Sequence, residues 1–205
     1  TVNIKDDKGS PIRLEDLDEI ASLSAVGEAA PSGSMNATAK FGYSDVTVSL
    51  YGTTPAYETI QGLKLKYGRF LKSADVDNAS YVTVLAYNTA EELFGKADVV
   101  GEELTIGGRN FRIVGVLEED KSLFASMLGG YSAYTPFTVE SRMADEPYIQ
   151  SLSVSPNGST DDTETQVNEF MLTRFHQDKD AFRLGNMSGI SAAMSTVAGT
   201  PSLLR

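Results

Sequence analysis

The 205-residue sequence lacks cysteine and tryptophan and contains one histidine, His176. Without cysteine the chain has no disulfide, no thiolate nucleophile and no cysteine-ligated metal. A single histidine also excludes zinc sites that need a histidine pair, including the two-histidine helical protease motif. The fold must therefore be stabilised by its apolar core, and a chain of this length is long enough for that.

Long apolar runs are missing as well. The sequence has no stretch of about 18 apolar residues, the minimum that suggests a membrane-spanning helix, and no recognisable signal peptide. It begins at Thr1 rather than at methionine. We therefore expect the chain to be a segment of a longer protein whose membrane-inserting parts lie outside it.

Positive charge is scarce, since 17 Lys and Arg stand against 28 Asp and Glu, for a formal net charge of -11. Such a surface repels the phosphates of nucleic acids, which argues against a nucleic-acid partner. It also repels an anionic cytoplasmic leaflet. A high net charge favours solubility, and attraction of cationic peptides or drugs stays open as an alternative.

Catalytic motifs are absent from the sequence. It has no Gly-x-Ser-x-Gly elbow, no Ser-x-x-Lys, no phosphate loop and no GxGxxG. We predict that His176 lies near the end of a helix, opposite the apolar face of Val167, Phe170 and Met171, as a solvated helix-terminal histidine. A hydrolase that uses His176 or a carboxylate pair is the least favoured alternative.

Adjacent carboxylates are the remaining candidates for a metal site, at Asp6–Asp7, Glu91–Glu92 and Asp161–Asp162. None of these pairs has the twelve-residue calcium-loop spacing with its glycine and closing glutamate. Asp161–Asp162 also stand at a predicted helix start, where the helix dipole favours negative charge. The sequence thus predicts no catalytic, cofactor or metal site.

The two ends of the sequence show the same order of predicted elements. Residues 1–5 alternate as a strand and residues 14–24 have helical spacing, while residues 151–155, 160–176 and 182–184 read as strand, helix and strand. We interpret this as a weak internal repeat. It favours an α+β fold in which a split lobe encloses a second, inserted unit.

The middle of the chain is predicted to be rich in strands. Two hairpins are expected, with arms at 36–41 and 46–51 and at 104–106 and 111–117, the second turning at Gly107-Gly108. A buried strand is expected at 81–85. Short helices end at Gly62 and Gly95, and their N-terminal signals are Thr54-Pro55 and Asn88 with Glu91.

The order of these central blocks carries a family resemblance. The blocks are Gly62–Leu71 (GLKLKYGRFL), Val82–Leu85 (VTVL), Glu92–Gly95 (ELFG), Val100–Gly108 (VGEELTIGG) and Phe111–Leu117 (FRIVGVL). In this order and spacing they resemble the periplasmic core domain of MacB-like permeases of bacterial ABC transporters, a superfamily that includes lipoprotein-releasing permeases. The blocks are fold-making residues, so the resemblance brings no active site and no cofactor with it.

The resemblance implies a specific organisation. Family members have four transmembrane helices, and this domain lies between the first and the second. It has a split membrane-proximal α+β lobe, expected here at 1–52 and 134–187, and an inserted strand-rich lobe, expected at 53–133. Residues 188–205 would then form a tail leading toward an absent transmembrane helix.

The resemblance also implies a function and a place in the cell. The domain would lie on the extracytoplasmic face of the membrane and couple ATP hydrolysis by a cytoplasmic ATPase to export or release of a peptide, antibiotic or lipoprotein. The full-length protein would be a homodimer, and the inserted lobe would contact an adaptor or substrate protein. A module that senses antimicrobial peptides or envelope components is the alternative, motivated by the acidic balance and by tyrosines of the inserted lobe.

Overall fold

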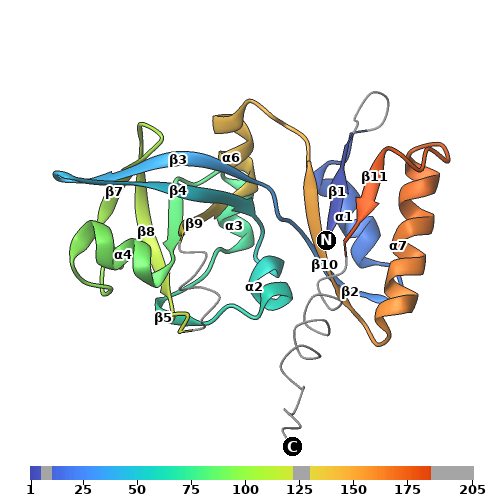
Figure 1. Ribbon diagram of the computed structural model, residues 1–205, viewed down its shortest axis with the longest axis horizontal. Helices are drawn as coiled ribbons and strands as arrows, with labels where there is room; N and C mark the ends of the chain where they lie inside the picture. Colours follow the sequence, from blue (N-terminus) through green and yellow to red (C-terminus); the bar gives the residue numbers. More distant parts are fainter. Residues whose placement is uncertain (6–10, 122–129, 186–205) are drawn as a thin grey trace, which may run out of the picture.

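The computed structural model (Figure 1) describes residues 1–5, 11–121 and 130–185. Its strands form two separate sheets, one of four strands and one of seven, which lie side by side with helices around each. The α+β class expected from the sequence is confirmed. The expected tail at 188–205 lies outside the described residues.

The four-stranded lobe is assembled from both ends of the chain. It contains β1 (Val2–Ile4), α1 (Leu14–Ala21), β2 (Val26–Pro31), β10 (Ser151–Pro156), α7 (Thr160–Arg174) and β11 (Phe182–Leu184). The strand order is β11-β1-β10-β2, and all neighbouring strands are antiparallel. This is the order of a split βαβ, or ferredoxin-like, motif, and the repeated unit predicted at the two chain ends is present.

The two helices of this lobe bury one apolar side each. Leu17 and Ile20 of α1 and Val167 and Met171 of α7 enter the same buried cluster, which also contains Leu152 of β10. Their spacings of three and four residues place each pair on one helix face. Removing each of these side chains from water contributes roughly 1.5–3 kcal/mol, and this burial holds together two segments that are distant in sequence.

The seven-stranded lobe is formed by the residues between β2 and β10. Its strands are β3 (Ser34–Phe41), β4 (Ser44–Thr53), β5 (Leu65–Gly68), β6 (Val82–Leu85), β7 (Glu103–Ile106), β8 (Arg109–Leu117) and β9 (Tyr131–Pro136). The order is β5-β8-β6-β9-β4-β3-β7, and β7 pairs with β8 as well. Six of the strands therefore close into a ring around an apolar core, and β5 extends from β8.

The described helices between β4 and β10 are α2 (Ala56–Gln61), α3 (Ser73–Asp77), α4 (Tyr87–Phe94) and α6 (Phe137–Ala144). Helices α4 and α6 lie on the seven-stranded sheet, α3 lies against α6, and α2 lies against β2 and β10 of the four-stranded sheet. The predicted Gly107-Gly108 hairpin is confirmed, since both residues have positive φ, 57° and 77°, as a two-residue turn between β7 and β8 requires. The predicted ends of α2 and α4 at left-handed Gly62 and Gly95 are confirmed too.

The predicted N-terminal signals of these two helices are wrong. Ala86 is the N-cap of α4, and the amide of Asn88 instead donates to the carbonyl oxygen of Gly130 at 3.0 Å. Pro55, not Thr54, is the N-cap of α2, and Thr54 contributes only its backbone carbonyl, which accepts from the Tyr57 amide. In both cases backbone or tertiary hydrogen bonds replace the local side-chain cap.

The chain passes from one sheet to the other at positions that differ from the lobe boundaries expected at 52 and 134. The hairpin of β3 and β4 pairs within the seven-stranded sheet, and so does the whole of β9. The first hairpin was expected in the split lobe because the family resemblance implies that this lobe extends to residue 52. From the hydrogen bonding we propose lobe boundaries near residues 33 and 150.

Candidate functional site

The junction between the lobes contains several polar contacts. The chain crosses between the lobes after β2 and again before β10, and the two crossings are joined by hydrogen bonds. The amide of Ser32 donates to the carbonyl oxygen of Ser151 at 2.9 Å, and their hydroxyl oxygens are 3.0 Å apart. The buried hydroxyl of Thr53 donates to the carbonyl oxygen of Pro31 at 2.7 Å.

An aromatic cluster supports this junction from the seven-stranded lobe. The ring of Tyr134 lies 5.3 Å from that of Tyr51 and 6.0 Å from those of Tyr57 and Phe70, measured between centroids. Ala30 of β2 packs into the same buried cluster. Burial raises the pKa of Tyr57 to about 12, with a further contribution from Tyr51, so its hydroxyl is neutral at physiological pH. Through Ala30 the four-stranded lobe therefore packs against uncharged aromatic rings.

Helix α6 contributes to both cores, because Phe137 belongs to the cluster of the four-stranded lobe and Val139 to that of the seven-stranded lobe. One turn along, Glu140 is only 8% exposed. It lies directly over Gly52 of β4, where an added Cβ would stand 2.5 Å from both Cβ and Oε2 of Glu140. Burial, assisted by Glu146, raises the pKa of Glu140 to about 7.

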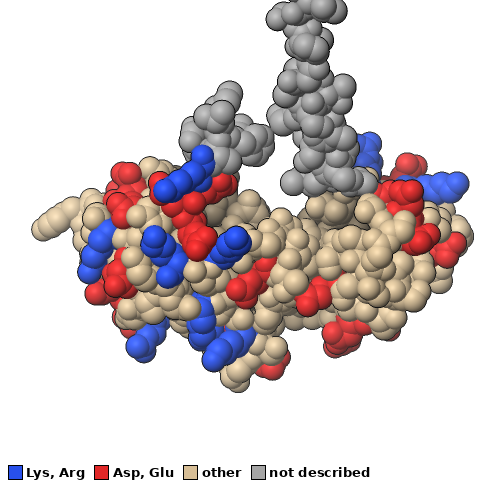
Figure 2. Space-filling model, turned by 90° about the horizontal axis from the view of Figure 1, so that it is seen from below, with Lys and Arg blue, Asp and Glu red and all other residues tan. Residues whose placement is uncertain are grey.

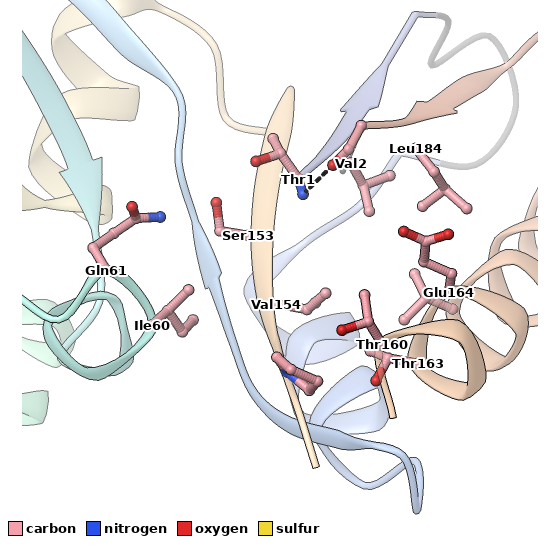
Figure 3. Close-up of a pocket in the computed structure, with 13 residues that line it drawn as sticks. Thr1, Val2, Ile60, Gln61, Ser153, Val154, Thr160, Thr163, Glu164 and Leu184 are labelled. Atoms are coloured by element: carbon pink, nitrogen blue, oxygen red, sulfur yellow. Dashed lines mark hydrogen bonds between the residues drawn. The ribbon is translucent and has the colours of Figure 1, made fainter. Parts of the chain in front are cut away.

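A cleft of about 360 Å³ opens between the lobes. Figure 3 shows Ile60 and Gln61 of α2 approaching it from one side and Thr160, Thr163 and Glu164 of α7 from the other. The backbone between them comes from β1, β10 and β11. The cleft is therefore lined by both lobes, and a change in their relative position would change its shape.

The ends of the described chain meet at this cleft. The amino group of Thr1 donates to the carbonyl oxygen of Gly185 at 2.9 Å, and both residues line the cleft. This agrees with the side-by-side ends expected of a domain that is inserted between two membrane helices. Within the described segments, no helix is long and apolar enough to cross a bilayer.

A second exposed feature is the tip of the β3–β4 hairpin, which projects away from the four-stranded lobe (Figure 1). Tyr43 is fully exposed, at 108%, and Phe41 is 39% exposed. Phe41 stacks on Phe94 of α4, with ring centroids 4.0 Å apart. On the face seen in Figure 2, acidic side chains are spread over both lobes, and most Lys and Arg side chains lie on the seven-stranded lobe.

The structure places the candidate residues of the sequence apart from one another. His176 is exposed just beyond α7, with a φ of 52°. Asp161 and Asp162 lie in the first turn of α7, where the Ser159 side chain accepts from the Asp162 amide. Glu92 accepts a hydrogen bond from the Tyr131 hydroxyl at 3.1 Å, and Asp6–Asp7 lie outside the described residues. Among residues 1–5, 11–121 and 130–185, no three His, Asp or Glu side chains gather as a metal site.

Sequence reasoning did not find the junction or the cleft. Glu140 and Ile60 carry no motif, and their importance arises from the packing of segments that are far apart in sequence. The sequence predicts a helix start at Thr54-Pro55 and no role for Thr53, whose hydroxyl donates to the Pro31 carbonyl oxygen at the first crossing. A threonine at the end of a long strand gave no signal for that role.

Comparison with known proteins places the chain among transporter domains. The family described as "MacB-like periplasmic core domain" matches residues 1–169. The macrolide export ATP-binding/permease protein MacB of Neisseria meningitidis is 29% identical over 197 residues, which cover 94% of this chain. The chain spans only 30% of the length of that relative.

Two solved structures share the fold. The periplasmic region of MacB from Actinobacillus actinomycetemcomitans superimposes with a TM-score of 0.75 at 23% identity, covering 98% of this chain and 92% of that one. The extracellular domain of the noncanonic ABC-type transporter YknZ from Gram-positive bacteria gives 0.70 at 21% identity, covering 90% and 98%. At these identities the likeness concerns the fold.

Proposed function

Because the chain belongs to the family of MacB-like periplasmic core domains, we propose that it couples ATP hydrolysis elsewhere in an ABC transporter to export or release of a substrate. The relatives are named as ATP-binding/permease proteins and are about three times as long as this chain. ATP binding and hydrolysis are assigned to a cytoplasmic part or subunit, and this chain performs no catalytic step. Transmembrane helices outside it would hold it at the extracytoplasmic face.

The observation that carries the proposal is the meeting of the described chain ends at the cleft between the lobes. The contact between Thr1 and Gly185 allows two adjacent membrane helices to enter the four-stranded lobe at one place. A movement of those helices would act on β1 and β11, which are paired with each other along three residues. Since β1 also pairs with β10, the movement would reach the crossing at Ser151 and the junction of the lobes.

The test uses the full-length transporter with its ATPase. A Tyr43→Cys substitution adds one thiol to this cysteine-free segment, at a fully exposed position far from the chain ends. Spin labels on the two copies of a homodimer should change their separation when ATP is added. A variant of the ATPase that binds but does not hydrolyse ATP should stay at the ATP-bound separation. Labels that keep one separation with and without ATP would contradict coupling through this domain.

The sensing alternative is favoured by the cleft, because a ligand lodged between two lobes can report its presence by changing their arrangement. In that case the domain would respond to ligand in the absence of ATP, and substrate would not be transported. The same labelled protein separates the two functions, since a sensor changes its label separation with ligand alone and a coupling domain changes it with ATP.

A further inference from the structure

The cleft between the lobes has mainly aliphatic walls. The aliphatic side chains that line it come from five elements: Val2 of β1, Ile60 of α2, Val154 of β10, Val167 of α7 and Leu184 of β11. None of the described residues that line it is aromatic. A volume of about 360 Å³ accommodates a small organic molecule, and such walls favour an aliphatic body that would otherwise stay exposed to water.

The polar groups at the cleft have unequal capacity to bind a ligand. The hydroxyl of Thr163 already donates to the carbonyl oxygens of Ala25 and Ser159, at 2.7 and 2.9 Å. Glu164 contributes the one charged side chain among the lining residues. In the described part of the chain, no Lys, Arg or His side chain forms an ion pair with Glu164. Apart from the Thr1 amino group, no other charged group of the described lining residues faces its carboxylate.

A cationic nitrogen already lies within electrostatic reach of Glu164. Burial lowers the pKa of the Thr1 amino group, and the negative charge of Glu164 opposes that change. Figure 3 shows Thr1 above the cleft and the Glu164 side chain turned toward the same space. The Thr1 amino group also donates a hydrogen bond to the carbonyl oxygen of Gly185. In the 205-residue chain the Thr1 amino group therefore competes with a cationic ligand for Glu164.

From these contacts we infer that the cleft between α2 and α7 binds a small organic amine with an aliphatic body, with its ammonium paired to Glu164 and its body between Ile60 and Val154. Binding needs neither ATP nor a membrane, so it does not depend on the proposed function. Because one wall belongs to each lobe, the bound amine would also hold the lobes in one arrangement.

Three ligands with the same aliphatic body isolate the contribution of charge. Octylammonium, octanol and octanoate are titrated into the 205-residue chain, and binding is followed from isotope-labelled methyl groups of Ile, Leu and Val by NMR. Octylammonium should bind most tightly, octanol less tightly and octanoate least, with the largest shifts at Ile60, Val154 and Val167. A ranking without preference for the cation would overturn the pairing with Glu164.

Substitutions then place the ammonium and the aliphatic body. Glu164→Gln should weaken octylammonium binding by roughly fivefold, as expected for a partly exposed ion pair, and leave octanol unchanged. Glu169→Gln is the matched control, because Glu169 lies on the same helix and does not line this cleft. Ile60→Ala should weaken all three ligands. Equal effects of the two glutamate substitutions would refute the assignment.

The Thr1 amino group provides an independent test of the charge preference. Acetylation removes its charge and leaves an N–H that can still donate to Gly185, so octylammonium should bind several-fold more tightly to the acetylated chain. If none of the three ligands binds at millimolar concentration, the inference fails. Failure here leaves the ATP-dependent label separation untouched, so the two proposals are tested separately.

Discussion

Replacing Glu140 by glutamine should make the protein more stable at alkaline pH and remove a specific part of its pH dependence. Glu140 is 8% exposed, and its side chain extends from α6 onto Gly52 of β4. Burial followed by the charge of Glu146 raises its pKa from the ordinary value of 4.5 to about 7. An acid with a raised pKa in the folded state takes up a proton on folding over this pH range.

The sign and size of the effect follow from proton linkage. Below pH 4.5 the Glu140 carboxyl is protonated in both the folded and the unfolded state, so it does not lower the free energy of unfolding. As the pH rises from 4.5 to about 7, the free energy of unfolding falls, and above that range the loss is complete. A pKa difference of this size corresponds to about 3 kcal/mol. Glutamine keeps the shape of the side chain and stays neutral, so the substitution should recover up to about 3 kcal/mol at pH 8 and little at pH 4.

The assay is urea unfolding at a series of pH values from 4 to 8.5, with the unfolding free energy extrapolated to water. The difference between Glu140→Gln and the parent isolates Glu140, because all other titrations are common to both proteins. Glu118→Gln is the control, since Glu118 is exposed after β8 and its substitution should give a difference that is flat with pH. A flat difference for Glu140→Gln as well would refute the reasoning.

Two further substitutions test the contacts at the junction through the free energy of unfolding. Gly52→Ala places a Cβ 2.5 Å from the α6 side chain above it and should cost about 1–3 kcal/mol, whereas Gly33→Ala meets no atom within 4 Å and should cost little; similar costs for the two would contradict the close approach. Thr53→Val removes the buried hydroxyl that donates to Pro31 and should cost about 1–3 kcal/mol by urea unfolding. Thr38→Val, at an exposed strand position, should stay within about 0.5 kcal/mol, and equal losses would show that the crossing bond is unimportant.

The elements that the sequence predicted correctly are those with strong local signals. The Gly107-Gly108 turn needs two residues with positive φ, and glycine provides them at no steric cost. Gly62 and Gly95 end their helices for the same reason. The spacing of Val167 and Met171 predicted the buried face of α7. Each of these features depends on residues within a few positions of one another, so it could be predicted without knowing the fold.

The elements that were missed depend on distant partners. Strand β9 has six residues and lies between β4 and β6, with which it makes parallel and antiparallel pairs. Helix α6 follows it with no N-terminal capping side chain. Closure of the ring requires β7 to pair with both β3 and β8. Short elements carry too little periodicity to be assigned from sequence, and these are fixed by pairing across the sheet.

The raised pKa of Glu140 also depends on a partner that is distant in sequence. The contact that raises it lies beside the junction on which the proposed coupling depends. In the sequence Glu140 is one acidic residue among 28, and only the close approach of Gly52 to α6 buries it. A glycine at that point allows the helix to lie on β4 next to the Thr53 crossing. The two lobes are joined by polar and aromatic contacts and by α6, whose Phe137 and Val139 each enter one of the two apolar cores. We therefore expect a movement of the chain ends to reach the seven-stranded lobe through α6 and the crossings beside it, as the proposed coupling requires.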